Sequence, residues 1–314
     1  MKKLLLNIFH IFRRKTLCMS MTICMCWGCV DKEITIRNEP TPSTNEKLNA
    51  LFEDALIGEK KFAHFNATLN YTYTSERGTK VSIVGNSLRL NGVPATGTVI
   101  LEFIELYDRA NMVATNKPTM GLLPNKESEM MLSGGEFYLN VTKNGQNLTA
   151  TSPISIVTSA ANTGGIVDGM RAFSGVITNN NLVWEQTPNV EIITDRKGNT
   201  YNLNVPGFGW FNCDKFYNYP EPKTTIMANV TNGYGNVSQV FLITKNVPNA
   251  LGGISGKFPV GLQCYLIFVT ENNGNFMWIT KEQTLTANHS VNFDIKDAQT
   301  GKRADLIGHV TLLR

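Results

Sequence analysis

The sequence predicts an all-β protein of two β-sandwich-like regions, which follow a leader, a tether and one short helix. From residue 62 onward, short runs rich in Val, Ile, Thr, Tyr and Phe are interrupted by Asn or Gly every eight to twelve residues. This pattern is typical of sandwiches and barrels. The chain has 314 residues, 42% of them hydrophobic and 17% charged, so it is neither short of core residues nor disordered in composition. Its length leaves room for about two domains.

The positive charge of the chain lies in its leader. The whole chain has 29 Lys and Arg against 25 Asp and Glu. Five of the basic residues and none of the acidic ones fall in residues 1–28, so the remainder has 24 basic against 25 acidic residues and a net charge of −1. A nearly neutral chain has no electrostatic attraction to nucleic acid, and we expect no nucleic-acid partner.

Residues 1–28 have the order of a secretory signal, namely a basic start, an apolar middle and a small residue at the cleavage site. The apolar run, residues 16–27, would span about 18 Å as a helix, which is too short for a bilayer core of about 30 Å. The Cys-Trp-Gly-Cys sequence at residues 26–29 resembles the lipobox of bacterial lipoproteins, although its first two side chains differ from those that the family prefers. The resemblance implies cleavage before Cys29 and acylation of its sulfur. The alternative is an ordinary cleaved signal with an incidental cysteine.

The residues after this cysteine bear on where the protein is displayed. Residues 30–33, Val-Asp-Lys-Glu, resemble the export signal that follows the lipid cysteine in surface-exposed lipoproteins of Bacteroidetes. A solvated tether explains them equally well. Two or more acyl chains on Cys29, such as palmitate, would anchor the protein stably, at about 0.8 kcal/mol per buried CH₂. We therefore expect an outer-membrane lipoprotein of the bacterial cell envelope, with exposure at the cell surface as the open question.

Residues 29–45 predict a flexible tether, because they are polar, contain Pro40 and Pro42 and show no hydrophobic period. Ser43 and Glu46 then have the spacing of a capping box. Apolar residues recur at helical intervals before Gly58, namely Leu48, Leu51, Phe52, Ala55 and Leu56. One short amphipathic helix is expected here.

The first β-sandwich region is predicted over residues 46–186, this helix included. Its expected strands are residues 79–85, 97–106, 129–132, 136–142, 154–157 and 181–185. Asn91-Gly92 and Asn144-Gly145 are expected to form hairpin turns, since Asn-Gly favours the turn type whose twist matches that of the flanking strands.

The second β-sandwich region is predicted over residues 187–314. Its expected strands are residues 200–205, 224–230, 240–244, 262–270, 276–280, 291–295 and 306–313. The division is placed near residue 187, within a turn-rich stretch. The last strand closes its own sheet in the simplest interpretation, and in the alternative it is donated to a neighbouring copy.

Three segments carry a resemblance to a known family. Residues 90–99 have the pattern G-x-P-x-x-G-x-V, residues 132–137 contain Ser-Gly-Gly, and residues 209–216 read Gly-Trp-Phe-Asn-Cys-Asp-Lys-Phe. The first two, with residues 105–108 and 111–113 between them, resemble the ZU5-like β-sandwich motif and the same run in uncharacterised Bacteroidetes cell-surface lipoproteins, and residues 209–216 resemble the second region of those lipoproteins. The resemblance covers roughly residues 60–310 and implies a sandwich with a binding role, by analogy with ZU5 modules in protein–protein interfaces. It carries over no enzymatic site.

Residue types that could support catalysis are present, but not at telling spacings. Beyond the leader, His64, His289 and His309 each stand without a nearby acid, and Ser133 precedes two glycines without a G-x-S-x-G elbow. Glu102 alternates with apolar neighbours, so a solvated strand face explains it better than a glycosidase carboxylate. The chain beyond the leader has no H-E-x-x-H, C-x-x-C or EF-hand sequence. We expect no enzyme, no metal site and no cofactor.

Cys213 and Cys264 are the remaining thiols once Cys29 is set aside. A bridge between them would close about 50 residues and contribute about 4 kcal/mol in the chain-entropy model. Cell-envelope compartments permit such a bridge. Cys264 also lies in an apolar strand, where a buried free thiol is equally ordinary. Both interpretations stay open.

Aromatic side chains are densest at residues 207–220. Trp210, Tyr217 and Tyr219 are the candidate ligand-contact residues, because exposed aromatic rings form sugar-stacking surfaces and interface hot spots. Core packing is the competing interpretation, and Tyr217 and Tyr219 are expected to be the exposed pair.

These observations together favour a membrane-anchored, non-catalytic binding or adhesion module with a surface protein or a glycan as partner. A fimbrillin-like structural subunit of a surface assembly is the alternative. A glycan-active hydrolase is the least favoured interpretation, because titratable pairs at useful spacing are missing from the sequence.

Overall fold

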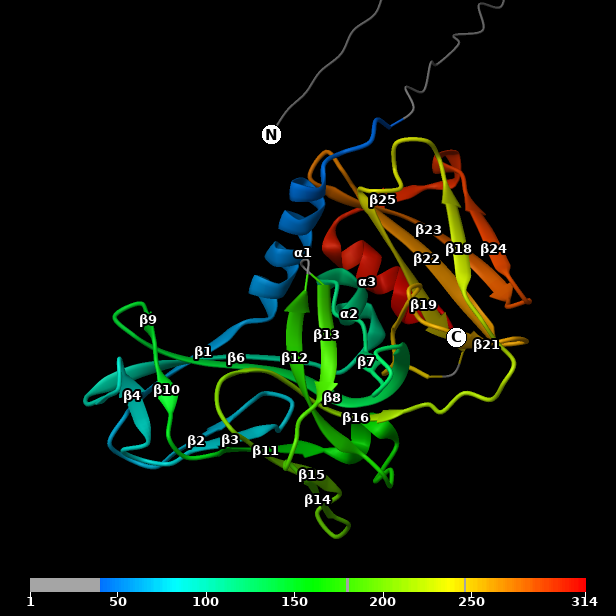
Figure 1. Cartoon of the computed structure of the whole chain (residues 1–314). Coiled ribbons are helices and arrows are strands. Elements are labelled where there is room, and N and C mark those ends of the chain that lie inside the picture. Colours follow the sequence, from blue (N-terminus) through cyan, green and yellow to red (C-terminus); the bar gives the residue numbers. More distant parts are fainter. Residues whose placement is uncertain (1–39, 179–180, 246) are drawn as a thin grey trace, which may run out of the picture. The chain divides into compact units, whose positions relative to one another are not determined.

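Strands are the commonest secondary structure in the computed structural model, which describes residues 40–178, 181–245 and 247–314 (Figure 1). The all-β fold class is confirmed, with short helices and several sheets. The described residues belong to one compact unit of the chain. The predicted signal, Cys29 and the tether as far as residue 39 lie outside these residues.

The central layer is an eight-stranded sheet in the order β1-β6-β8-β16-β12-β13-β7, with β9 paired to β8. Its strands are β1 (Lys61–Asn66), β6 (Thr98–Leu106), β7 (Met120–Leu122), β8 (Ser128–Lys143), β9 (Gln146–Asn147), β12 (Arg171–Thr178), β13 (Asn181–Gln186) and β16 (Gly209–Phe216). Neighbours are antiparallel, except that β13 is parallel to β7. The two strands predicted at residues 129–132 and 136–142 are therefore one continuous strand, β8, which contains Ser133, Gly134 and Gly135.

A five-stranded sheet in the order β14-β15-β11-β3-β2 packs on one face of the central sheet. Its strands are β2 (Tyr71–Thr74), β3 (Lys80–Ile83), β11 (Ile154–Ser159), β14 (Ile192–Asp195) and β15 (Thr200–Val205). Side chains of β11 alternate between buried and half-buried, as expected of a strand with one face on a core. Ile154 and Ile156 share a buried cluster with Leu101, Phe103 and Leu203. These two sheets form a β-sandwich, flanked by the short strands β4 (Leu88–Leu90), β5 (Val93–Pro94) and β10 (Thr149–Ala150).

Helices cover the other face of the central sheet. They are α1 (Asn45–Glu59), α2 (Arg109–Thr115) and α3 (Arg303–Leu312), and they lie between the central sheet and the C-terminal sheet (Figure 1). Leu48 and Phe52 of α1, Trp184 and Trp210 of the central sheet and Leu306 of α3 belong to one buried cluster. The fold therefore has a helical layer inside it, which the alternating strand pattern did not predict.

The C-terminal sheet has the order β20-β19-β22-β23-β25. Its strands are β19 (Ser238–Thr244), β20 (Gly252–Gly253), β22 (Gln263–Asn272), β23 (Asn275–Thr284) and β25 (Gln299–Gly301). On its outer face, Leu266 and Phe268 pack with Val291 and Phe293 of the parallel pair β18 (Ile226–Val230) and β24 (His289–Phe293). Shorter elements complete this half, namely β17 (Lys223–Thr224), β21 (Phe258–Pro259) and the 3₁₀ turn η2 (Ile295–Asp297), while η1 (Ala160–Thr163) follows β11.

Both predicted Asn-Gly hairpins are confirmed. Asn91 and Gly92 have φ values of 50° and 81° and join β4 to β5, with Leu90 opposite Val93. Asn144 and Gly145 have φ values of 51° and 77° and join β8 to β9. Positive φ at both central positions is the requirement of a type I′ turn, which Asn and Gly meet at low steric cost.

The predicted N-terminal helix is confirmed as α1, but its cap is one residue later than expected. Thr44 is the N-cap, and its side chain accepts a hydrogen bond from the Lys47 backbone N–H at 3.3 Å. Ser43 hydrogen-bonds to Glu271 instead. Pro40 is also held, because its carbonyl accepts a 2.6 Å hydrogen bond from the Tyr234 hydroxyl. The predicted tether of residues 29–45 therefore ends where residues 40–43 meet the C-terminal half.

Two helices correct the sequence-based assignment. Residues 306–313, predicted as a strand, belong mainly to α3, so they offer no strand for donation to a neighbour. Leu306 and Val310 are its buried residues, and a spacing of four is helical. Asp305 accepts a hydrogen bond from the Lys302 backbone N–H and so stabilises the start of this helix. Helix α2 was not predicted at all, because its seven residues are too few to show a period.

The division predicted near residue 187 also needs correction. Strands β14, β15 and β16 follow this position, yet β15 pairs with β11 and β16 pairs with β8 and β12 of the first region, while β14 extends the same sheet beside β15. The strand pairing changes after Phe216, where the chain enters the C-terminal sheet. Because one buried cluster contains residues from both regions, the two halves share a core.

Candidate functional site

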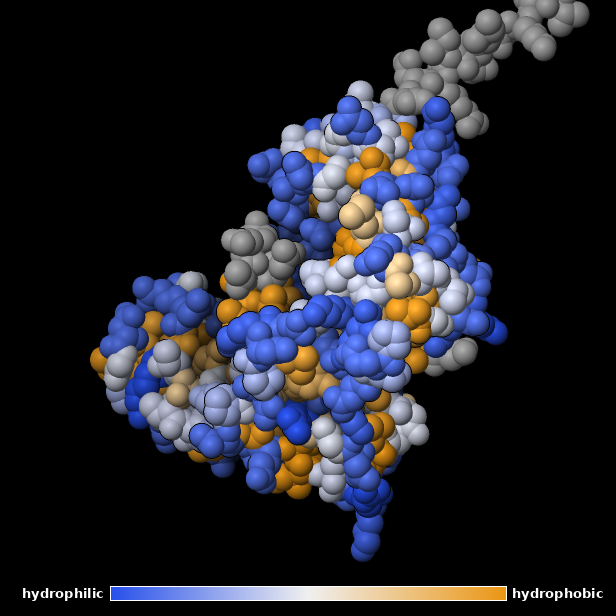
Figure 2. Space-filling view, turned by 45° about the vertical axis from the view of Figure 1, so that its right-hand side comes forward, coloured by the Kyte–Doolittle hydropathy of each residue, from blue (hydrophilic) through white to orange (hydrophobic). Residues whose placement is uncertain are grey.

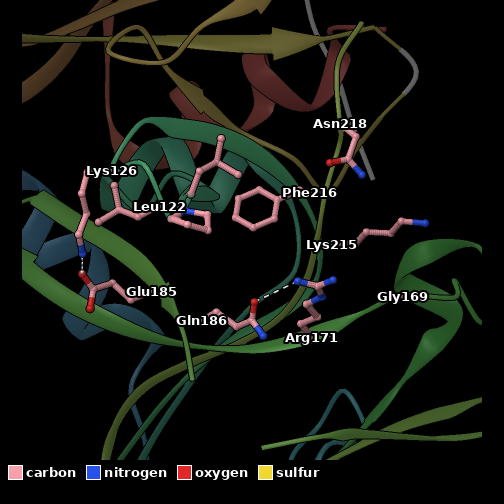
Figure 3. A pocket seen from close by; sticks show the side chains of 11 residues that line it. Leu122, Lys126, Gly169, Arg171, Glu185, Gln186, Lys215, Phe216 and Asn218 are labelled. Carbon is pink, nitrogen blue, oxygen red and sulfur yellow. Dashed lines mark hydrogen bonds and ion pairs between the residues drawn. The ribbon is translucent and has the colours of Figure 1, made fainter. Parts of the chain in front are cut away.

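A cleft of about 510 Å³ opens where the ends of β7, β12, β13 and β16 meet (Figure 3). It is lined by Leu122, Leu123, Pro124, Lys126, Gly169, Arg171, Glu185, Gln186, Lys215, Phe216 and Asn218. This volume lies within the usual range of small-ligand sites. Figure 3 shows Lys126 and Glu185 at one side of the cleft, Arg171 and Lys215 at the other, and the Phe216 ring between them.

The strand register of the central sheet assembles these residues. Arg171 is the first residue of β12 and lies opposite Asp214 of β16, so the next residue, Lys215, is brought to the same end of the sheet. Gln186 is the last residue of β13 and lies opposite Phe173. The turn between β7 and β8 supplies the remaining wall, with Lys126 at a φ of 65°.

The cations of this cleft are only partly neutralised. Lys126 lies 3.7 Å from a Glu185 oxygen, and both side chains are largely exposed. Arg171 donates to the neutral amide oxygen of Gln186 at 3.1 Å. Among the described residues, neither Arg171 nor Lys215 has an ion pair with a carboxylate. The cleft thus holds two cationic groups without an acidic partner.

A second cleft, of about 320 Å³, shows the contrasting case on the other side of Leu123. There, Lys223 lies 3.2 Å from Glu129, and Lys257 lies 2.5 Å from Glu127. The hydrogen bond from Lys257 lowers the pKa of Glu127, as expected of a carboxylate beside a cation. Because its lysines are paired with carboxylates, this second cleft has less free positive charge to offer an anion.

The apolar part of the larger cleft centres on Phe216. Its ring packs edge-to-face on Phe173, with centroids 5.5 Å apart and an interplanar angle of 84°. Gly121 makes room for it, since a Cβ at this position would lie 2.8 Å from the Phe216 ring and 2.5 Å from the Met131 sulfur. Leu122 and Pro124 line the cleft beside the ring (Figure 3). The site therefore combines cations, one carboxylate, amides and an apolar wall.

The surface elsewhere favours this cleft as the candidate site. Figure 2 shows a face on which hydrophilic residues predominate and hydrophobic residues appear in small separate groups. The large exposed apolar side chains come from scattered elements, among them Phe62, Leu69, Ile177, Met227 and Leu312. Singly exposed apolar residues are normal and need no partner.

Trp210 is a mostly buried residue that lines the edge of a smaller cleft, with Phe52 and Lys117 beside it. Its side chain is 7% exposed and belongs to the central cluster, where its ring centroid lies 5.4 Å from that of Tyr138 and 6.3 Å from that of Trp184. The Lys117 ammonium lies 5.7 Å from the ring centroid, a cation–π distance. Core packing is therefore its main role.

Tyr217 and Tyr219, expected as an exposed pair, are half-buried. Their rings stack at 5.0 Å with an interplanar angle of 11°, and both pack against the C-terminal core. Burial raises the pKa of Tyr217 to about 12 and raises that of Tyr219 further. Stacked residues at successive odd positions lie on one side of an extended chain, here the side facing the core.

Cys213 and Cys264 are both free and fully buried, so the alternative of two free thiols holds in this structure and the bridge does not form. They belong to different buried clusters, one inside the sandwich and one behind the C-terminal sheet. Burial raises the pKa of the Cys213 thiol, and that of Cys264 to about 12. Thiols held in this way are poor nucleophiles.

Two buried carboxyl groups lie in the centre of the molecule, on β8 and β16. Glu136 and Asp214 are completely buried, and neither oxygen of Glu136 has a hydrogen-bond partner among the described residues. Asn212 donates to Asp214, and Ser133 donates to Asn212. Burial raises the pKa of both carboxyl groups, and the neighbouring Asp214 adds to the effect on Glu136. The cluster is closed to solvent, so it offers no substrate access.

The described residues contain no group of three or more His, Cys, Asp or Glu side chains placed to hold a metal ion. In this same part of the chain, none of the helices has the length and apolarity to cross a bilayer.

The residues of the cleft were not predicted as a site from the sequence. The aromatic-rich stretch at residues 207–220 contains the cleft residues Phe216 and Asn218, but the sequence analysis selected other residues of this stretch as candidates. Arg171 and Lys215 are separated by more than forty positions and meet only through the register of β12 with β16. The chain matches no protein-family model, and no curated protein matches it either.

Proposed function

We propose that this chain is a lipid-anchored protein of the bacterial cell envelope, held through Cys29, which binds an anionic ligand without catalysis in the cleft between β12, β13 and β16. The observation that carries the binding proposal is the presence of Arg171 and Lys215 in one cleft with no carboxylate of the described residues paired to either. The anchor proposal depends on the lipobox-like residues 26–29.

The positive charge of Arg171 and Lys215 favours an anionic ligand. A carboxylate or similar group would give Arg171 and Lys215 charge-assisted hydrogen bonds, each worth about 1.5–3 kcal/mol net. Lys215 is half-buried, and its side chain lies close to Gly169, where an added Cβ would be 3.6 Å from the Lys215 Cε. A cation against such a wall is screened less by salt than one on an open surface.

The non-catalytic part of the proposal follows from the cleft's own chemistry. Glu185 is its single carboxylate among the described lining residues, and this carboxylate faces Lys126 at 3.7 Å. Acid–base hydrolysis of a glycoside would need a second carboxyl group across the site. The buried pair Glu136 and Asp214 does not line the cleft.

The described fold begins at Pro40, which is held in place by contacts with the C-terminal half. Pro40 is hydrogen-bonded to Tyr234, and an added Cβ at Gly233 would lie 2.7 Å from the Pro42 ring. In Figure 1 this junction lies at the end that carries β18 and β25, whereas β14 and β15 lie at the opposite end and the cleft strands lie between.

The binding proposal is tested with the full chain purified in detergent. Immobilised polyglutamate, dextran sulfate and oligogalacturonide serve as anionic probes, and neutral dextran serves as the control. We expect at least one anionic probe to bind with an affinity that falls with salt. The double variant Arg171→Gln/Lys215→Gln should lose about tenfold or more, whereas Lys257→Gln, in the neutralised cleft, should not. Failure of every anionic probe, or equal binding by the double variant, would refute the proposal.

The anchor is tested separately. Metabolic labelling of cells with palmitate should mark the wild-type chain and not Cys29→Ala, and the variant should leave the membrane fraction. Label retained by Cys29→Ala would assign the acylation to another residue.

A further inference from the structure

The two unpaired cations do not fill the cleft, and the groups beside them narrow the choice of ligand. Glu185 brings one negative charge to the opposite side, and Gln186 and Asn218 bring amide groups that both donate and accept hydrogen bonds. The Phe216 ring lies between the two sides (Figure 3). Any ligand has to suit all of these groups at once.

Glu185 argues against a densely charged ligand. A polyphosphate or heavily sulfated group that extended from Arg171 across the cleft would approach this carboxylate and be repelled. Phosphate sites also often use the N-terminus of a helix, and none of the described residues that line the cleft belongs to a helix. A ligand with one negative charge at one end meets neither problem.

The remaining groups fit hydroxyls and an apolar ring face. Carboxylate and amide side chains such as Glu185, Gln186 and Asn218 recognise hydroxyl groups, which both donate and accept. The C–H face of a sugar ring is apolar and packs on an aromatic ring such as Phe216, with Pro124 and Leu122 beside it. Hydrogen-bonding groups around an apolar wall are what a small polyhydroxylated ligand requires.

We propose that the ligand is an acidic saccharide carrying a single carboxylate, as in a uronic or sialic acid residue. Its carboxylate pairs with the Arg171 guanidinium, with Lys215 adding positive charge on the same side of the cleft, its ring packs against Phe216, and its hydroxyls face Gln186, Asn218 and Glu185. The planar fork of Arg171 suits a carboxylate, and its bond to Gln186 at 3.1 Å holds the fork in place. This inference names the ligand class of the proposed binding site and rests on that proposal.

The test measures affinity of the full chain in detergent for matched acidic and neutral sugars. Oligogalacturonide is compared with neutral oligogalactoside of the same length, and sialyllactose with lactose, by titration calorimetry. The acidic member of at least one pair should bind about tenfold or more tightly, and the pair that does so distinguishes a uronic from a sialic source.

Variants separate the parts of the site. Arg171→Gln should weaken acidic-sugar binding about tenfold, and Arg171→Lys should restore only part of it. Phe216→Leu tests the packing of the sugar ring on the Phe216 ring. Asn218→Ala, at an exposed position, tests the contacts to the sugar hydroxyls without disturbing the core. Lys257→Gln is the charge-matched control, and circular dichroism checks that each variant is folded.

The outcomes keep the two proposals apart. Polyglutamate binding that depends on Arg171, with no binding of any acidic sugar, would overturn the saccharide inference in favour of an acidic peptide and leave the anion site standing. Equal affinity for acidic and neutral sugars would also overturn it. If no anionic probe binds at all, both proposals fail.

Discussion

Glu136 and Asp214 are fully buried, and burial raises the pKa of both carboxyl groups above their ordinary values. The folded protein therefore keeps protons that the unfolded chain releases above its carboxyl pKa of about 4. Their contribution to stability is fully present below that pH and is lost as the pH rises through the folded-state pKa. The free energy of unfolding should fall with rising pH on their account.

Glu136→Gln removes one of these groups without changing its shape. We expect the free energy of unfolding of the variant, measured relative to wild type at the same pH, to be higher at pH 7.5 than at pH 4.5. The expected increase is about 1 kcal/mol or more, because each unit of pKa shift corresponds to about 1.4 kcal/mol. Urea denaturation at both pH values measures this. Glu76→Gln, at a strongly exposed carboxylate, is the control and should show no such gain. An equal stability difference at both pH values would contradict the assignment.

The two buried thiols give a prediction that concerns accessibility. Cys213 and Cys264 are fully buried, and the pKa of each is raised, so the reactive thiolate is scarce at neutral pH. Iodoacetamide followed by peptide mass spectrometry should leave both cysteines unmodified in the native protein and modify both after denaturation without reductant. Cysteines that stay unmodified in the denatured, unreduced sample and react with iodoacetamide only after reduction would indicate a disulfide.

At the scale of single elements, α3 completes the helical layer between the central sheet and the C-terminal sheet. Leu306→Ala should lower the free energy of unfolding by about 2–5 kcal/mol, because Leu306 is completely buried and its removal leaves a cavity. Leu312→Ala is the matched control on the same helix, since Leu312 is 77% exposed. Chemical denaturation of both variants makes the comparison. Equal and small losses would argue that α3 does not pack as described.

The elements that were predicted correctly are those whose signal is local. Strands such as β6, β15 and β22 alternate or run apolar over several residues, and the Asn91-Gly92 turn needs no distant partner. Helix α3 was missed because Leu306, Ile307, Val310 and Leu313 also read as an apolar strand over eight residues. Tertiary packing on the central cluster decides between these interpretations.

The cleft could not be predicted from the sequence, because it too depends on contacts between residues that are distant in the chain. Arg171 and Lys215 are ordinary charged residues at the ends of two strands, and nothing in their neighbourhoods marks them. Their significance appears once β12 pairs with β16 and no carboxylate is found against them in the described part of the chain. The many aromatic residues at positions 207–220 pointed to this segment, but the rings of Trp210, Tyr217 and Tyr219 pack against the buried clusters.

At the scale of the whole molecule, the two halves share one buried cluster. Trp184 and Trp210 of the central sheet, Trp278 of the C-terminal sheet and helices from both ends of the chain belong to it. Separating the halves would expose this cluster to water, at about 25 cal/mol per Å² of apolar surface. The halves should therefore unfold together, in contrast to independent domains, which unfold separately.

Tryptophan fluorescence can test this, because the three tryptophans among the described residues report on both halves. Trp278→Phe leaves Trp184 and Trp210 as reporters of the central sheet, and the double variant Trp184→Phe/Trp210→Phe leaves Trp278 as reporter of the C-terminal sheet. In each variant, urea unfolding followed by fluorescence and by far-UV circular dichroism should give the same midpoint, because one cooperative transition moves both probes. The comparison is made within each variant, so the stability lost through the substitution does not affect it. A fluorescence midpoint that precedes or follows the circular dichroism midpoint would show that one half unfolds before the other and that the shared cluster does not couple them.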